Sequence, residues 1–248
     1  MTASPDNVVP MRRRAAPIAF GLRHLLLIKI MVWLIALLPA LRLGVGVLGP
    51  VLAPSEGSFL LALGKDLGAN PLETLTRNTG FTALCLLSLT LAVTPLRQWL
   101  GQPWLIRLRR MLGLFAFFYA ALHVLCWVWF DHFFDPREMA KDVLKRPFIT
   151  LGFIAFALLV PLALTSFNAA LRFLGGRRWQ WLHRLVYVAA PLAVAHFWWM
   201  KAGKHDFAQP LGFVAVLALL AGARVAWRQR ERRARATPTD WIQVSRKS

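Results

Sequence analysis

The sequence is poor in charged residues, and acidic residues are the scarcest of them. Of its 248 residues, 17% are charged, 11 are Asp or Glu, and 57% are hydrophobic. Soluble domains carry roughly 25% charged residues, so this composition excludes an ordinary soluble enzyme. Several apolar stretches reach the ~20 residues needed to cross the hydrocarbon core of a bilayer. We therefore predict an all-α protein, a polytopic bundle of membrane-spanning helices.

The motifs of soluble redox enzymes are also absent. The two cysteines, Cys85 and Cys126, do not have the spacing of a metal-binding or redox pair. No segment offers the strand–turn–helix setting of a nicotinamide-binding unit. A glycine-rich phosphate loop and a pair of acids placed for hydrolysis are missing as well. We predict no catalytic residues in this chain, and we expect a separate molecule to donate any electrons that pass through it.

Six membrane spans are predicted from hydropathy. They cover roughly Leu22–Leu48, Gly80–Pro95, Met111–Phe130, Phe148–Thr165, His183–Met200 and Phe207–Trp227. The second span is short, but glycine and proline are natural helix boundaries. The first span is too long for the apolar region of a signal peptide, and no small-residue cleavage site follows it. We therefore expect the first span to be retained as a helix.

The distribution of basic residues predicts the orientation. Lys and Arg collect in the N-terminal arm, the second and fourth connections and the C-terminal tail, whereas most acids lie in the other connections. Short basic connections stay in the cytoplasm, so both termini are predicted to be cytoplasmic. The net charge of +19 lies in these short runs, which argues against a nucleic-acid partner. The predicted organisation is a basic arm (1–21), a transmembrane domain (22–227) and a basic tail (228–248).

Three histidines lie within apolar stretches or at their ends, namely His123, His183 and His196. An ionisable residue at membrane depth is disfavoured and therefore marks a functional site. Neutral imidazole is the commonest protein ligand for metals and an axial ligand of haem iron. The alternative to metal binding is a structural role: a neutral histidine hydrogen-bonded inside the bundle, or an interfacial residue in the case of His183. The other three, His24, His132 and His205, are expected at the surface.

The depth of the histidines determines how they can pair. The third and fifth predicted spans cross the membrane in the same direction. His123 lies 12 residues after Met111 and His196 lies 13 residues after His183, or roughly 18 and 20 Å along a helix. The two are predicted to share one bis-histidine haem near the external face. At the level of His183 the third span offers only Arg109 and Arg110, so a second haem there lacks a histidine partner.

The basic residues at the cytoplasmic face form a candidate cofactor site. Arg109, Arg110 and Arg184 could pair with haem propionates or with the phosphate of a flavin, because guanidinium groups bind such anions well. The alternative is that these arginines serve only to anchor the chain in its orientation. The sequence leaves both interpretations open.

A set of ordered motifs adds a resemblance to a known family. The motifs are TGFTAL (Thr79–Leu84), TPLR (Thr94–Arg97), PWLIRLRRMLGL (Pro103–Leu114), RPFITLG (Arg146–Gly152), LALTS (Leu162–Ser166) and WQWLHRLVY (Trp179–Tyr187), with His123 and His196 beside them. Over roughly Thr79–Met200 the chain resembles the MsrQ family, also called YedZ. That family belongs to the ferric-reductase-like transmembrane group. The basic arm and tail carry little of the resemblance.

The resemblance implies a function. Members of the family are haem b proteins of the bacterial inner membrane, and they supply electrons to MsrP, a periplasmic molybdopterin enzyme that reduces methionine sulfoxide in oxidised proteins. For this chain it implies haem ligation by His123, His183 and His196, quinol or reduced flavin as the electron donor, and FMN as a further cofactor. The wider group often carries two histidines on each of two helices, whereas the third span here has one.

Two other functions remain open from the sequence. One is a different ferric-reductase-like carrier that delivers electrons to a metal ion or to oxygen. The lack of a fused flavin and nicotinamide domain argues against it. The other is a non-redox transporter that uses the histidines as a proton relay. A haem absorption band would exclude that alternative.

The charge distribution generates a prediction about topology. A reporter fused after Ser248 and a second one inserted near Arg172 should both report the cytoplasm, because both positions belong to arginine-rich segments. The measurement is the activity of reporters that are active on only one side of the membrane. A periplasmic signal at either position would contradict the six-span arrangement.

Overall fold

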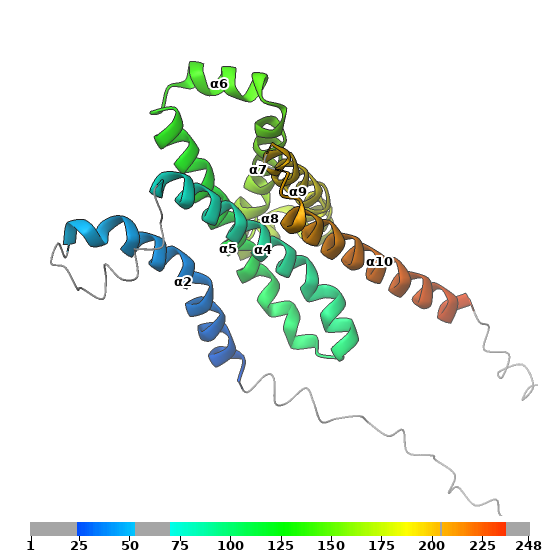
Figure 1. Cartoon of the computed structure of the whole chain (residues 1–248). Helices are drawn as coiled ribbons and strands as arrows, with labels where there is room; N and C mark the ends of the chain where they lie inside the picture. Colours follow the sequence, from blue (N-terminus) through cyan, green and yellow to red (C-terminus); the bar gives the residue numbers. More distant parts are fainter. Residues whose placement is uncertain (1–23, 53–69, 204, 237–248) are drawn as a thin grey trace, which may run out of the picture.

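The structure, a computed structural model, describes residues 24–52, 70–203 and 205–236 (Figure 1). In this part of the chain every regular element is helical. Six helical segments are long and apolar enough to cross a membrane, namely Leu25–Val47, Pro71–Leu100, Pro103–Asp131, Pro147–Leu164, Asn168–Ala202 and Ala208–Arg233. The predicted all-α, six-span membrane bundle is therefore confirmed, and its orientation stays a prediction.

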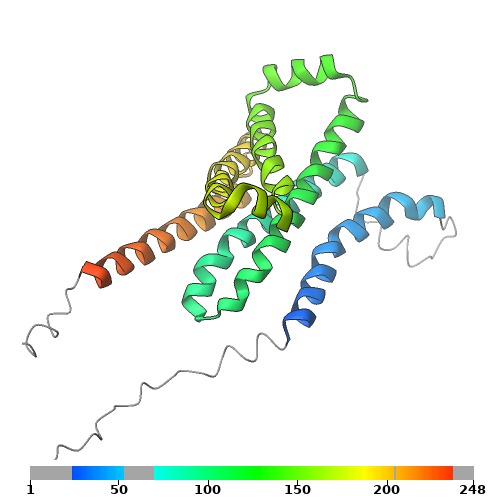
Figure 2. The same cartoon turned by 180° about the vertical axis from the view of Figure 1, so that it is seen from behind.

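The helices form two hairpin-like pairs with one helix on either side. The spanning helices are α2 (Leu25–Leu52), α4 (Pro71–Leu100), α5 (Ile106–Cys126), α7 (Pro147–Leu164), α9 (Val186–Ala202) and α10 (Ala208–Ala236). The main contacts join α4 to α5 and α7 to α9. Helices α2 and α10 lie on opposite sides of these pairs in both views (Figures 1 and 2). The two pairs therefore form the centre of the bundle.

The two ends of the bundle differ. The short helix α6 (Pro136–Lys145) lies across one end and connects α5 with α7, and the tight turn at Gly101 between α4 and α5 lies at the other (Figure 1). We call these the α6 end and the Gly101 end. The charge distribution predicts that the α6 end faces the outside of the cell. Helix α6 was not expected from the sequence, which placed a connection there.

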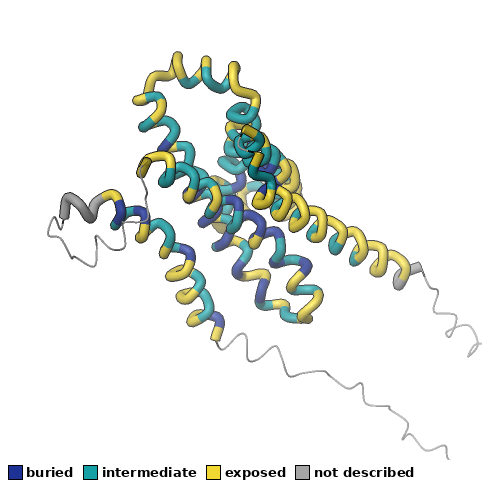
Figure 3. The backbone as a smooth tube through the Cα atoms, in the orientation of Figure 1, coloured by how far each residue is buried: buried dark blue, intermediate teal, exposed yellow. Residues whose placement is uncertain are grey.

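Buried residues concentrate where α4 and α5 meet each other and α9 (Figure 3). A central cluster contains Leu87 and Leu91 of α4, Ala116 of α5 and Ala190 of α9. Large apolar side chains elsewhere point outward; Leu26 of α2, for example, is 70% exposed. Exposed apolar surface on this scale suits contact with lipid and not with water.

Helix α4 is much longer than the predicted second span, and the boundaries assigned to Gly80 and Pro95 are wrong. The helix begins at Pro71, where the side chain of Asn70 accepts a hydrogen bond from the Glu73 amide. It ends at Gly101, which adopts a left-handed conformation with φ of 62°. Both features are preferred at helix ends. Gly80 and Pro95 lie inside the helix and require another explanation.

A partly buried arginine compensates for the proline in α4. Pro95 has no N–H, so the carbonyl of Leu91, four residues earlier, loses its helical donor. The guanidinium Nη2 of Arg224, on α10, donates a hydrogen bond to this carbonyl. The guanidinium carbon lies 5.3 Å from the ring centre of Tyr187 on α9, over its face. Arg224 therefore connects three helices at a position where a backbone group would otherwise lack a partner.

The fifth span is also built differently from the prediction. The continuous helical run begins at Asn168 and passes through α8 (Asn168–Leu182), a short 3-10 segment η4 (His183–Leu185) and α9. Its last part, η4 and α9, corresponds to the predicted span His183–Met200. Gly175, with φ of 73°, interrupts α8. Helix α10 continues to Ala236, so the first part of the predicted basic tail is helical. The predicted arm (1–21) and the end of the tail lie outside the described residues.

The arrangement at Pro95 generates a prediction about stability. Replacing Arg224 by Met removes the donor to the Leu91 carbonyl, and an unsatisfied buried group costs about 1–3 kcal/mol. Pro95→Ala supplies a backbone N–H in its place, so Arg224→Met should then destabilise the protein less. The measurement is a double-mutant cycle of unfolding free energies in detergent.

Arg228, one turn further along α10, is exposed and provides the control. Arg228→Met removes the same charge but should not interact with Pro95→Ala. An equal loss of stability for Arg224→Met with and without Pro95 would contradict the proposed compensation.

Candidate metal centre

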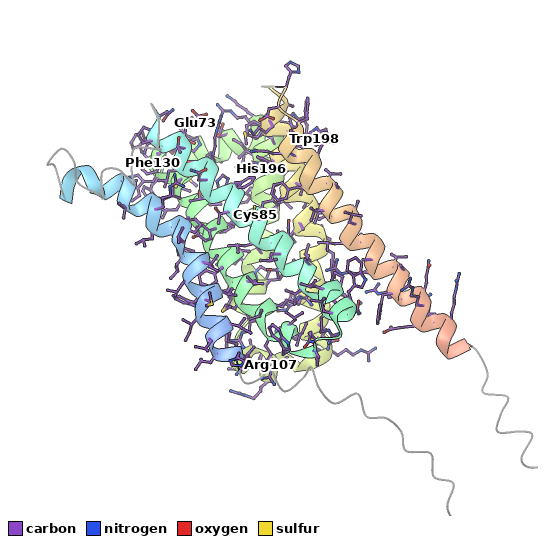
Figure 4. All side chains as sticks on the ribbon, turned by 60° about the horizontal axis from the view of Figure 1, so that its bottom comes forward. Glu73, Cys85, Arg107, Phe130, His196 and Trp198 are labelled. Carbon is purple, nitrogen blue, oxygen red and sulfur yellow. The ribbon has the colours of Figure 1, made fainter. Side chains whose placement is uncertain are left out.

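The structure brings two of the three predicted histidines together. His123, near the end of α5, and His196, on α9, face each other with ring centres 6.1 Å apart and ring planes at 71°. Both side chains are partly buried. Figure 4 places His196 toward the end of the bundle that carries Glu73 and Phe130, far from Arg107 at the Gly101 end. The predicted pairing at matched depth near the α6 end agrees with this geometry.

Hydrogen bonds to the backbone orient both rings. The Nδ1 atom of His123 lies 2.8 Å from the carbonyl oxygen of Thr76 on α4. The Nδ1 atom of His196 lies 2.6 Å from the carbonyl oxygen of Phe148 on α7. A carbonyl oxygen only accepts, so each Nδ1 carries the proton, and Nε2 of a neutral imidazole keeps its lone pair. Metal-binding histidines are oriented in this way by a second hydrogen-bonded group.

The pair fits an iron ion with two axial imidazoles. An ion held between two imidazole nitrogens at about 2 Å leaves the ring centres roughly 6 Å apart, which matches the observed 6.1 Å. Among the described residues, no group of three or more His, Cys, Asp or Glu side chains could hold a metal. A haem needs no such group, because the porphyrin supplies four nitrogens and the protein supplies the axial ligands. The donor set present therefore suits haem better than a bare metal ion.

His183 lies apart from this pair, toward the Gly101 end. Its Nδ1 atom is 3.1 Å from the carbonyl oxygen of Trp179 in the preceding turn, and its ring stacks on the Trp179 indole at 3.9 Å. The Trp179 indole in turn donates to the carbonyl of Thr165 at the end of α7. The Nε2 atom of His183 is buried and has no partner. Because a buried polar atom normally has one, this nitrogen is a candidate ligand atom.

The three arginines proposed as cofactor ligands do not form one group. Arg109 is partly buried on α5 and acts electrostatically on both His183 and Arg224. Arg110 donates to the side chain of Asn168 at 2.6 Å. Arg184 is exposed. Of the three, Arg109 lies in the best position to reach a ligand at His183.

Other buried polar atoms near His183 were missed from the sequence. Within the described residues, the buried side-chain atoms without a partner are Ser88 Oγ, Thr94 Oγ1, His183 Nε2 and Arg224 Nε. Ser88 and Thr94 lie one turn before and after Leu91, whose carbonyl accepts from Arg224. All four atoms therefore belong to the half of the bundle toward the Gly101 end. A charged residue inside an apolar span, here Arg224, was the available sequence signal.

A second polar group, at the α6 end, was also missed. The carboxylate of Asp142 on α6 accepts from the indole of Trp127 at 3.3 Å and lies 3.1 Å from Nε2 of His132 and 2.9 Å from Nε of Arg146. His132 was expected at the surface, but its side chain is only 12% exposed. Trp127 begins a π-helical turn, η3 (Trp127–Asp131), one turn beyond His123. Asp142 thus ties α6 to the end of the helix that carries the candidate ligand.

The fold and the histidine pair point to one class of membrane protein. Residues 79–194 match the family described as ferric reductase like transmembrane component. The matched range contains His123 and His183 and ends two residues before His196. The six-helix bundle with a partly buried histidine pair is thus a ferric-reductase-like transmembrane domain.

Similar proteins define the family more closely. A protein-methionine-sulfoxide reductase heme-binding subunit MsrQ from Herminiimonas arsenicoxydans is 57% identical over 209 residues, which cover 84% of this chain and 89% of that protein. A protein of the same name from Ralstonia nicotianae is 55% identical over 81% of this chain and 85% of its own length. A third, from Bordetella pertussis, is 56% identical over 72% and 87%. The chain belongs to the MsrQ family.

Proposed function

We propose that this chain is the haem-binding membrane subunit of a protein-methionine-sulfoxide reductase system. Electrons from quinol or reduced flavin enter at the Gly101 end and leave at the α6 end. There they reach a periplasmic partner, a molybdopterin enzyme of the MsrP type, which repairs oxidised methionines. The names of the similar proteins support the haem and the association with a methionine-sulfoxide reductase. The bacterial inner membrane is the location in which such a path crosses from cytoplasm to periplasm.

One observation carries the proposal. His123 and His196 come from helices distant in the sequence, and their ring centres lie 6.1 Å apart. The Nδ1 atom of each ring is hydrogen-bonded to a backbone carbonyl. A pair of neutral histidines that only filled space would need no such common orientation. With Nδ1 protonated in both rings, each imidazole instead keeps a lone pair on Nε2 that can bind a metal ion. It supports axial ligation of haem b by this pair.

The residues of the chain suit electron transfer better than reaction with a substrate. Haem iron supplies reversible one-electron transfer when it is bound. His123 and His196 would hold the haem through two imidazole nitrogens, and the iron would then have no open position for oxygen or a substrate. Apolar helices surround the pair and exclude water, and the ring of Phe148 stacks beside His196 at 6.1 Å. These features argue against binding of oxygen or a substrate to the iron.

The Gly101 end supports a second cofactor or donor site. The unpartnered Nε2 of His183 is buried there together with the unpartnered Nε of Arg224. Arg109, on α5, adds a positive charge close to both. Along a helix the 13 residues from His183 to His196 span roughly 20 Å, so a site at His183 would divide the crossing into two shorter steps. Quinol and FMN are the ligands that the resemblance supplies for it, with Arg110 and Arg184 as further anion-binding candidates; a second haem there would lack a histidine partner on α5.

The first prediction from this proposal concerns the axial pair. Purified wild-type protein should give a reduced-minus-oxidised difference spectrum of low-spin haem b, and quinol should reduce that haem. His123→Ala and His196→Ala should each abolish the low-spin species, because each removes one axial ligand. The measurement is haem content per polypeptide together with the difference spectrum.

His205→Ala is the matched control, since His205 is exposed and lies beyond the end of α9. It should keep the haem content of the wild type. Full occupancy with an unchanged spectrum in either axial variant would exclude the proposed pairing. A wild-type chain without any haem band would favour the non-redox transporter instead.

A second prediction concerns His183. His183→Ala should retain more haem than His123→Ala or His196→Ala, because the outer pair stays intact, but reduction by quinol or reduced flavin should become slower. The measurement compares haem content and the rate of donor-driven haem reduction in all three variants. Arg178→Ala, at an exposed position five residues before His183, tests by the same assay whether loss of a neighbouring exposed charge alone slows the reaction.

Two results would contradict this role. If His183→Ala loses haem as completely as His123→Ala, then His183 is a primary axial ligand. If it keeps both its haem and its reduction rate, then His183 is only an interfacial residue stacked on Trp179.

A further inference from the structure

Each histidine of the candidate axial pair lies directly against a glycine of the neighbouring helix. A Cβ atom added to Gly80 on α4 would lie 2.9 Å from Nδ1 and 3.0 Å from Cε1 of His123. A Cβ atom added to Gly152 on α7 would lie 2.8 Å from Nδ1 and 3.0 Å from Cε1 of His196. The two distances to Nδ1, 2.9 and 2.8 Å, are shorter than those found for real Cβ atoms. The rings thus occupy the space that any other residue would fill.

The same helices supply the hydrogen bonds that orient the rings. His123 bonds to the carbonyl of Thr76, four residues before Gly80, and His196 bonds to the carbonyl of Phe148, four residues before Gly152. In a helix this carbonyl already accepts from the amide of the residue four positions later, which here is the glycine itself. The imidazole can approach a carbonyl that is already engaged in the helix only where no Cβ covers it.

The contact at His123 and the contact at His196 are built in the same way. The carbonyl and the histidine are separated by 47 residues in the first pair and by 48 in the second. In each, the glycine lies on the first helix of a pair, α4 or α7, and the histidine lies on the second, α5 or α9. Two independent occurrences with the same offset from carbonyl to glycine argue against accidental packing.

We propose that Gly80 and Gly152 are positioning residues for the two axial histidines. Each glycine admits an imidazole to the backbone carbonyl one turn before it, which keeps the proton on Nδ1 and directs Nε2 toward the iron. This inference rests on the proposed function, because it assumes haem between His123 and His196. It extends that function by assigning the residues that determine the orientation and basicity of the ligands.

The hydrogen bonds have a direct consequence for the redox equilibrium. A hydrogen bond from Nδ1–H to a carbonyl makes the imidazole a more basic ligand, and a more basic ligand favours ferric over ferrous iron. An alanine at either glycine should push the ring away and lengthen this bond. The ferrous form should then become easier to reach, and the low-spin signal should change because the angle between the ring planes changes.

The test uses Gly80→Ala and Gly152→Ala in the full-length chain with haem. We expect haem to bind about 10-fold more weakly or worse, as for other groups that orient metal ligands. In the protein that retains haem, the ferrous-to-ferric ratio at a fixed applied potential should rise several-fold; a tenfold rise corresponds to about 59 mV for a one-electron couple. The ferric electron paramagnetic resonance g values should shift, since they depend on the angle between the imidazole planes.

Gly113→Ala and Gly212→Ala are the matched controls. Gly113 lies on α5 with His123, and an added Cβ would meet only the Thr90 methyl group at 3.6 Å, an ordinary contact. Gly212, on α10, would meet nothing within 4 Å. Because alanine is the better helix former, these substitutions should not weaken the helices. Haem affinity, potential and g values should stay as in the wild type.

The outcomes separate this inference from the function on which it rests. Altered haem affinity, potential or g values in the glycine variants, with unaltered controls and helical content, would support the positioning role. A wild-type protein with low-spin haem and glycine variants identical to it would overturn the inference alone. If both glycine variants lose helical content while both controls fold, the glycines are packing positions, which also overturns it. A wild-type chain that binds no haem overturns the proposed function itself.

Discussion

Within a bilayer a backbone carbonyl that loses its helical donor finds no water to replace it, and this constraint explains how α10 and α2 are joined to the central helices. At Pro95 the vacated carbonyl of Leu91 is taken by Arg224 from another helix. Tyr119, on α5, bonds to the backbone of α2. Its hydroxyl donates to the carbonyl of Ala36 at 2.6 Å and accepts from the amide of Ala40 at 3.0 Å. A hydroxyl inserted between a carbonyl and the amide four residues later replaces their helical hydrogen bond, so that neither the carbonyl nor the amide lacks a partner. Such bonds connect α10 and α2 to the central pairs.

The same backbone chemistry orients the candidate ligands. The carbonyls of Thr76 and Phe148 fix the tautomers of His123 and His196, and the carbonyl of Trp179 does so for His183. The first two bonds cross between helices, whereas the third lies within one chain segment. The outer pair is therefore held by the packing of α4 on α5 and of α7 on α9. His183 depends instead on the local turn at η4 and on its stacking with Trp179.

Much of this architecture could be predicted from the sequence, for physical reasons that also explain the errors. Hydropathy identifies spans because lipid requires long apolar helices, and a common direction of crossing puts His123 and His196 at one depth. The ends of α4 were wrong because glycine and proline were taken as helix boundaries, which is their usual meaning. Here Gly80 makes room for an imidazole from α5, and Pro95 is compensated by Arg224 from α10. Both reasons lie in residues far away in the sequence, which a local pattern does not contain.

The two ends of the bundle differ in whether their polar groups have hydrogen-bond partners. At the α6 end the polar groups near the histidine pair are paired, and Asp142 binds Trp127, His132 and Arg146. Toward the Gly101 end, by contrast, lie all four of the buried side-chain atoms that lack a partner in the described part of the chain. Four unpaired polar atoms in an apolar bundle would be expensive without compensation. Under the proposed function, a polar or anionic donor bound beside His183 would give its Nε2 atom a partner, and Arg109 would supply positive charge close to it. The outer pair would then hold an iron between two complete ligands, whereas the inner site would take a partner that brings hydrogen-bonding groups of its own.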